Sequence, residues 1–479
     1  MNFEELKEKI SDPNSSIEET HLILYDTFKE LEKEDVEVSK IQMTGEILKF
    51  LLEKAKEHKE EQIKSKLYHF FEKGKNIFKK NSLDENKSTE QKEKSFEMLL
   101  KLLPSYVGFL TTKPKFPTQE YSDLFKIIIS SQRIASCLIN VLKDYMIYED
   151  LRINFWIALD IAASKFILET YHVQNILQLI VAIIAKNEKS QQDGIKPLQY
   201  YCGVKIGVLK PKEIGKHVQN IWEQVSSVDV PSMTRQLLLQ TLLERMIFKM
   251  DKPIFLTDYF MASVQCGGPV SILALQGIFT LVQKYNINYP NIYEKLYEML
   301  NSSIFGTHYK ARLFFLTDVF LSSLHLPETL VAGFVKRLAR LSLVAPPADI
   351  AVMLALITNL LIRHSGLHKL ITNLGKHYHE NDPYLSKETD PCASKGLESS
   401  LWEVKLLQHH ALPSISAAAM FIENPLPAVE RDLADLLECD SNQVFSREVK
   451  KKLRDPPTSF EHPSLLSVER GFTYWDFSS

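Results

Sequence analysis

Histidines in the second half of the sequence are the side chains best placed to bind a metal ion. His364 and His368 are four residues apart, which puts them on one face of a helix, and His377, His379 and Cys392 follow nearby. A zinc site needs three or four such ligands and further residues that orient them. The spacing does not supply that set. We therefore interpret these histidines as solvated side chains at a helix end, and we expect no metal and no cofactor.

Signatures of catalysis are also missing from the sequence. It contains no glycine-rich phosphate loop, no HExxH pair and no nucleophile elbow. Its five cysteines are scattered without a CxxC pair, which is typical of a reducing compartment. We expect a protein that is not an enzyme, and an enzyme remains the alternative from a different class.

Lysines and aromatic residues are interleaved between Lys54 and Lys80, a composition that can bind RNA phosphates and bases. An amphipathic helix with a solvated lysine face would give the same pattern. The net charge of −3 excludes binding of nucleic acid by bulk charge, so any RNA contact must be local. The candidate RNA-contacting residues are Lys64, Lys66, Lys73, Lys75, Lys79 and Lys80, with a second basic cluster at Lys450, Lys451 and Lys452.

The elements that would carry these residues are predicted to be helices throughout. Apolar blocks are separated by short polar or proline-containing loops, and strand signals are nearly absent. We expect an all-α protein, an elongated α-solenoid of HEAT- or armadillo-like helical hairpins. The longest apolar stretches, Ile176 to Ala185 and Ile350 to Ile362, are shorter than the roughly 20 residues of a bilayer span. No transmembrane span is expected.

Shifts in composition divide the chain of 479 residues into five predicted regions. Residues 81–94 have one aliphatic residue and no aromatic one, which predicts a mobile charged linker. The other regions are an N-terminal helical region (1–80), a helical-repeat region (95–250), a second helical domain (255–430) and a C-terminal helix and tail (431–479). The tail ends in exposed aromatic residues that would dock on a partner or back on the chain.

The second helical domain contains the most informative stretch, 382–420. A predicted helix has Ser400 and Glu403 at the spacing of a capping box, and Pro413 ends it or opens the next helix. If the Trp402 indole is buried, its truncation to alanine should cost about 3–5 kcal/mol. The apolar face of this helix consists of Leu397, Leu401, Val404 and Leu407.

Several blocks of this domain together resemble a known family. They are SILALQGIFTLVQKYN with YPNIYEKLYEML, then LPETLVAGFVKRLARLSLVAPP, then LESSLWE with LQHH and a proline. In this order, over about residues 255–430, they resemble the CCAAT-binding-factor and nucleolar-complex family of ribosome assembly factors. The family-motif residues, expected to have a structural or partner-binding role, are Pro346, Pro347, Glu398, Ser399, Ser400, Leu401, Trp402, Glu403 and Pro413.

The resemblance implies a scaffold in the nucleus and nucleolus, with association with the nuclear envelope left open. The short chain is most similar to the member that forms a heterodimer with nucleolar protein fourteen. That member joins the small-subunit processome, which matures the 40S precursor and its 18S rRNA, and contacts pre-rRNA locally or indirectly. The alternatives are a large-subunit (60S) assembly factor of the same family and a transcription regulator.

Overall fold

The computed structural model describes residues 25–33, 36–57, 61–84, 86–106, 116–132, 135–192, 200–202, 211–285, 289, 291–372 and 381–451. All regular secondary structure in these ranges is helical, so the predicted all-α fold is confirmed. None of the described helices is long and apolar enough to cross a membrane. The chain divides into two compact units, Met1–Tyr289 (unit 1) and Pro290–Ser479 (unit 2). The sequence instead placed a boundary between residues 250 and 255.

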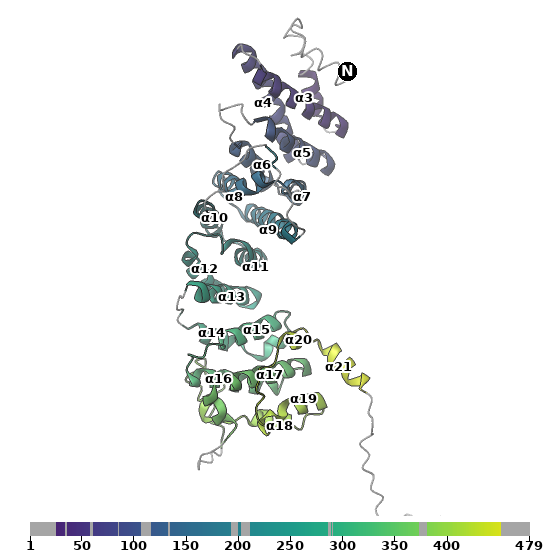
Figure 1. Cartoon of the computed structure of the whole chain (residues 1–479). Coiled ribbons are helices and arrows are strands. Elements are labelled where there is room, and N and C mark those ends of the chain that lie inside the picture. The colour runs from purple at the N-terminus through teal and green to yellow at the C-terminus, as the bar shows by residue number, and fades with distance from the viewer. Residues whose placement is uncertain are drawn as a thin grey trace, which may run out of the picture. The chain divides into compact units, whose positions relative to one another are not determined.

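Unit 1 is a stack of helical hairpins (Figure 1). Each helix contacts the next but one along the chain, as α3 does with α5, α6 with α8, and α7 with α9, which is the packing of a solenoid. Two short turns, Leu242–Met246 and Pro253–Leu256, precede its last two helices. The helices of unit 1 are α3 (Val38–Glu57), α4 (Glu61–Leu83), α5 (Thr89–Tyr106), α6 (Thr118–Ser130), α7 (Ala135–Tyr145), α8 (Glu149–Ala163), α9 (Thr170–Gln192), α10 (Pro211–Ser226), α11 (Ser232–Thr241), α12 (Thr257–Val264) and α13 (Gly268–Tyr285).

The core of unit 1 lies between these stacked helices because their apolar residues recur every three or four positions. Leu124, Phe125 and Ile128 on α6 are all buried. Phe125 packs edge to face against Phe155 of α8, with 5.5 Å between the ring centroids. Burial of such faces, rather than intrinsic helix propensity, supplies most of the stability of helices of this length.

The mobile linker predicted at 81–94 is instead a turn between two packed helices. α4 continues to Leu83 and α5 begins at Thr89. The composition argument was wrong here because the buried side chains are polar and find hydrogen-bond partners. Asn81 donates to the carbonyl oxygen of Leu31 over 3.2 Å, and Lys87 donates to the same oxygen over 2.7 Å.

Unit 2 is built around α17, whose sequence is apolar on most faces. Its residues from Ala348 to Leu361 are almost all buried, and it contacts helices on several sides (Figure 1). Short 3-10 turns lie at Ser302–Gly306, Ser365–Leu370, Gly396–Glu398 and Met420–Ile422. The helices are α14 (Ile292–Met299), α15 (Lys310–Phe320), α16 (Glu328–Ser342), α17 (Pro347–Arg363), α18 (Trp402–Leu407), α19 (Pro413–Ala419), α20 (Ala434–Leu437) and α21 (Ser441–Lys450).

The segment that follows α19 is tied to α17 by polar contacts. The side-chain amide of Asn359 donates to the Arg431 carbonyl over 2.9 Å, and its oxygen accepts from the Arg431 N–H over 2.8 Å. Arg363 at the end of α17 binds both Asp318 of α15 and Glu430. The start of the region predicted as a separate tail, at residue 431, is therefore anchored to the core of unit 2.

Candidate functional site

Four of the family-motif residues, Ser399, Ser400, Trp402 and Glu403, lie around one buried lysine in unit 2 and the aspartate paired with it. Lys336 on α16 is fully buried, and its ammonium donates to the carbonyl oxygen of Ser400 over 2.6 Å and to Glu403 Oε2 over 2.9 Å. The same ammonium lies 3.0 Å from Asp382 Oδ2. We call Lys336, Arg340, Asp382, Trp402 and Glu403 the Lys336 cluster. It joins α16 and α18 to the loop that begins at 382.

Asp382 is the residue on which most of these contacts converge. Its Oδ2 accepts from Arg340 over 2.7 Å and from the Trp402 indole over 2.9 Å. Its Oδ1 accepts from the Ser399 hydroxyl over 2.5 Å. Burial would raise the pKa of Asp382, but hydrogen bonds from Ser399, Trp402 and Lys336 outweigh it and hold the pKa well below its usual range.

Glu403 does not form the predicted capping box. The residue before α18 is Leu401, and no side chain caps this helix end. The Glu403 carboxylate instead lies 2.8 Å from both Lys336 Nζ and Arg340 Nε. The prediction of a capping box was wrong because the Glu403 carboxylate forms ion pairs with two residues of α16 and not a hydrogen bond to the backbone N–H groups at the start of its own helix.

Trp402 is only partly buried, so the condition on which the large cost of its truncation was predicted is not met. Its side chain is 37% exposed. The ring lies under the guanidinium of Arg340, 4.8 Å from the ring centroid, and Lys336 Nζ lies 5.4 Å from that centroid. These are cation–π distances. The apolar face predicted beside it is buried through Leu401, Val404 and Leu407, but Leu397 lies in a separate 3-10 turn.

The Lys336 cluster balances two cations against two carboxylates, so it neutralises itself and fixes geometry. The helix and the loop approach closely: a Cβ on Gly333 of α16 would lie 2.5 Å from the Pro391 carbonyl oxygen. A Cβ on Gly396 would lie 2.8 Å from the Ala332 carbonyl oxygen. The Lys336 cluster therefore holds the loop between Asp382 and α18, which we call the motif loop, against α16. The role of its charged groups is structural.

The remaining motif residues lie at helix starts or on the surface. Pro346 precedes α17 and Pro347 opens it, and Pro413 opens α19, one of the two roles predicted for it. Asp349 lies in the first turn of α17 and pairs with Lys310 of α15 over 2.9 Å. Glu398 and Ser400 are exposed.

The lysines predicted to contact RNA do not form one free basic face. Lys75 pairs with Glu72 over 2.9 Å, and Lys79 pairs with Asp123 over 2.6 Å. Lys73 and Lys80 are exposed on α4, and Lys73 lies over the ring of Tyr25. In the second basic cluster, Lys450 is exposed and Lys451 pairs with Glu448. The side chains of Lys64 and Lys66, and all of Lys452, lie outside the described residues.

The histidines that could have held a metal do not converge. α17 ends at Arg363, so His364 and His368 lie beyond it, where each ring contacts a backbone carbonyl oxygen, of Leu321 and of Leu361 respectively. His377 and His379 fall outside the described residues. Within the described ranges, no three His, Cys, Asp or Glu residues are grouped as metal ligands would be.

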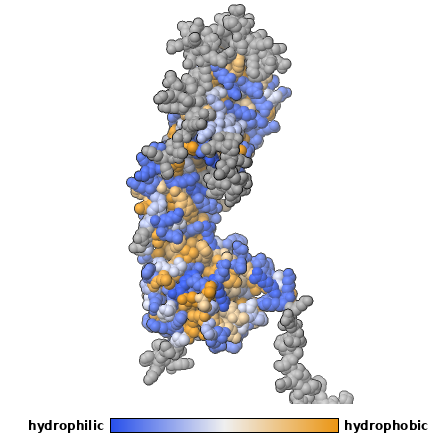
Figure 2. Space-filling model, viewed as in Figure 1, coloured by the Kyte–Doolittle hydropathy of each residue, from blue (hydrophilic) through white to orange (hydrophobic). Residues whose placement is uncertain are grey.

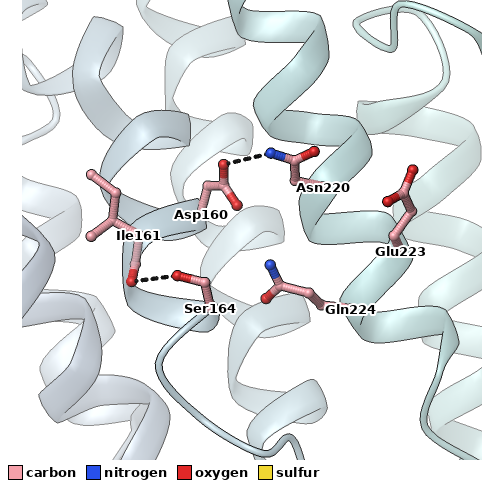
Figure 3. Close-up of a pocket in the computed structure, with 6 residues that line it drawn as sticks. All are labelled: Asp160, Ile161, Ser164, Asn220, Glu223 and Gln224. Atoms are coloured by element: carbon pink, nitrogen blue, oxygen red, sulfur yellow. Dashed lines mark hydrogen bonds between the residues drawn. The ribbon is translucent and has the colours of Figure 1, made fainter.

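A polar cleft that sequence reasoning missed lies between α8 and α10 in unit 1 (Figure 3). It has a volume of about 540 Å³, and Asp160 and Ser164 face Asn220, Glu223 and Gln224 across it. The Asp160 carboxylate is 2.7 Å from His217 Nδ1 and accepts from Asn220 over 3.1 Å. The Ser164 hydroxyl donates to the Ile161 carbonyl. Because the Asp160 carboxylate and the Ser164 hydroxyl already have hydrogen-bond partners, the cleft joins two helices and presents no activated nucleophile among these side chains.

An exposed apolar face on α21 is the feature most suited to binding another protein. Phe445 and Val449, four residues apart, are 70% and 67% exposed. α21 lies at the periphery of unit 2, where it contacts α17 (Figure 1). Elsewhere on the visible face of unit 2, hydrophobic residues are interspersed among hydrophilic ones (Figure 2).

Comparison with known proteins agrees with this placement of the motif. The profile of the CBF/Mak21 family matches residues 271–419. The nucleolar complex protein 4 homolog of Danio rerio is 34% identical over 72% of this chain and 67% of its own length. The homolog A of Xenopus laevis is 33% identical over 78% of this chain and 76% of its own length. The homolog of Homo sapiens is 34% identical over 70% of this chain and 66% of its own length.

An all-α protein with this motif region and these relatives belongs to the CBF/Mak21 family. The relatives that it matches over most of its length are nucleolar complex protein 4 homologues. The chain is accordingly a nucleolar protein with a role in ribosome biogenesis.

Proposed function

We propose that this protein is a non-enzymatic scaffold in the assembly of the small (40S) ribosomal subunit and the maturation of 18S rRNA. In this role it forms a heterodimer with nucleolar protein fourteen inside the small-subunit processome. The observation that carries the proposal is the solvent-exposed apolar face of Phe445 and Val449, in the same unit as the family motif.

The face on α21 has the geometry that a partner protein requires. Anchors at i and i+4 lie on one side of a helix and can enter a hydrophobic groove together. The C-terminal end of α21 is held by polar contacts, since Glu448 hydrogen-bonds to Ser414 of α19 and to Lys451. A few anchor residues contribute most of the binding energy of a protein interface, and aromatic side chains such as that of Phe445 are enriched there.

A scaffold is favoured over an enzyme by the state of the polar clusters. The Lys336 cluster pairs its cations with its own carboxylates. The Asp160 carboxylate is occupied by His217 and Asn220. In the described residues, therefore, neither cluster has the uncompensated, perturbed group in a cleft that usually marks an active site.

The partner assignment is tested by a pull-down with purified nucleolar protein fourteen. The double variant Phe445→Asp with Val449→Asp should abolish capture because it places charges on the apolar face. The matched control is Ile167→Asp in unit 1, a side chain that is 95% exposed, which should bind as the parent protein does. Unchanged capture by the double variant would contradict the assignment of this face.

The subunit assignment is tested by replacing the parent protein in cells with the double variant and measuring mature rRNA. Loss of 18S rRNA with unchanged large-subunit rRNA is the expected result. Loss of large-subunit rRNA instead would favour the 60S alternative.

A further inference from the structure

A polar cavity in unit 1 lies where the turn between α4 and α5 approaches the end of α6. Its volume is about 720 Å³, and its lining includes Lys87, Lys92, Ser131 and Gln132. It is separate from the motif region, and none of its lining residues is among the lysines that the sequence singled out.

Two buried lysines line the cavity. Lys87 and Lys92 are 4% and 3% exposed. The Lys87 ammonium donates to two neutral oxygens, the Leu31 carbonyl and Asn81 Oδ1, both over 2.7 Å. Burial lowers the pKa of Lys87, and only part of this effect is offset by Asp84 and Glu32. The local environment would therefore be stabilised by an anion.

The start of α5 adds backbone donors to the same cavity. Ser88 and Gln91 form a capping box, in which the Ser88 hydroxyl accepts from the Gln91 N–H and the Gln91 side chain accepts from the Ser88 N–H. The first intrahelical bond runs from the Lys92 N–H to the Ser88 carbonyl, so the N–H groups of Thr89 and Glu90 lack an intrahelical acceptor. Such groups and the helix dipole favour anions.

Ser131, on the opposite wall, is the independent sign of a ligand. It is 7% exposed, and its hydroxyl has no hydrogen-bond partner within the described part of the chain. Its backbone is held in place because Asn175 of α9 donates to the Ser131 carbonyl over 2.6 Å. A buried polar group without a partner costs about 1–3 kcal/mol, so a rigidly held one that lines a polar cavity points to a missing acceptor or donor.

We propose that this cavity binds a phosphate group of single-stranded RNA together with its ribose. Lysines, helix N–H groups and a serine hydroxyl are phosphate ligands, and the side-chain amides of Asn86 and Gln132 in the lining can bond a 2′-hydroxyl. Lys80, exposed near the end of α4, lies outside the lining but close enough to Lys87 to lower its pKa, so it would favour a ligand with a second phosphate. These amides and this cation favour RNA over a phosphopeptide. The proposal rests on the proposed role in ribosome assembly.

The test measures binding of a fluorescent single-stranded oligouridylate to the full chain by anisotropy over a series of salt concentrations. Ser131→Ala should raise the Kd about threefold to tenfold while the melting temperature stays the same or rises, because an unpartnered hydroxyl is removed. Lys92→Gln should raise the Kd and reduce the slope of log K against log salt by about 1. Lys101→Gln, an exposed lysine on α5 paired with Glu97, is the matched control and should leave the Kd unchanged.

Unchanged RNA binding by both cavity variants overturns the proposal. So does a phosphoserine peptide, or the deoxyribose oligomer, that binds as tightly as the RNA and is weakened by the same variants. The pull-down with nucleolar protein fourteen, repeated with Ser131→Ala, separates the two ideas: retained capture with unchanged RNA binding would reject the cavity and leave the proposed function standing.

Discussion

Lys336 on α16 and Glu403 on α18 form an ion pair between two fully buried side chains, with 2.8 Å between Nζ and Oε1. Taking both charges out of water is costly, and the pair is retained only because each charge has further partners. The relationship joins residues that are far apart in the sequence.

Replacing one member of this pair should be far more damaging than replacing both. Lys336→Met leaves the buried Glu403 carboxylate paired only with Arg340, a side chain 37% exposed, and should cost about 3–5 kcal/mol of unfolding free energy. The double variant Lys336→Met with Glu403→Leu should recover part of that loss. Hydrogen exchange at the amides of α18, which reports unit 2 alone, measures both effects. A double variant whose loss equals the sum of the two single losses would argue against coupling.

Asp382 should account for part of the loss of stability of the folded protein at acid pH. Its pKa in the folded protein lies below its ordinary value of 3.8, so its contribution is present above that pH and is lost as the pH falls towards the folded value. The effect of Glu403 on the pH dependence of stability has the opposite sign, since burial raises the pKa of Glu403. Asp382→Asn should therefore flatten the fall in melting temperature between about pH 4 and about pH 2. Asp229→Asn, at a side chain 97% exposed, is the control, and parallel profiles for both variants would refute the role of Asp382.

Trp402→Phe should destabilise the protein by only about 1–2 kcal/mol, because it removes one hydrogen bond to a carboxylate and keeps an aromatic ring beside Arg340. Trp222 on α10 is 4% exposed, and Trp222→Ala should cost about 3–5 kcal/mol. Urea denaturation measures both. A loss of the larger size for Trp402→Phe would mean that the indole is packed in the core.

Gly333→Ala should separate α16 from the motif loop. The added Cβ would lie 2.5 Å from the Pro391 carbonyl oxygen and 2.9 Å from the Ser394 hydroxyl. Relief of this clash should cost about 1–3 kcal/mol. Gly306→Ala, whose Cβ would meet no atom within 4 Å, is the matched control. Equal melting temperatures for the two variants would contradict the close approach.

Local rules predicted much of the fold and part of the motif region. The recurrence of apolar residues predicted helices throughout, and Pro413, predicted at a helix end or start, opens α19. Leu401, Val404 and Leu407 are buried as their spacing indicated. These predictions were correct because helix periodicity and helix starts depend on residues within a few positions of one another.

The sequence by itself therefore determined the helices, their apolar faces and the family resemblance. Only the tertiary structure decided the partners of the polar residues. The spacing of Glu403 predicted a local cap, but Glu403 pairs with a lysine on another helix. The sequence left the burial of Trp402 open, and in the fold its side chain is 37% exposed. The turn at 81–94 reads as a mobile linker, yet Lys87 is buried there. Charges and hydrogen bonds act between atoms that folding brings together, and spacing along the chain does not encode those distances.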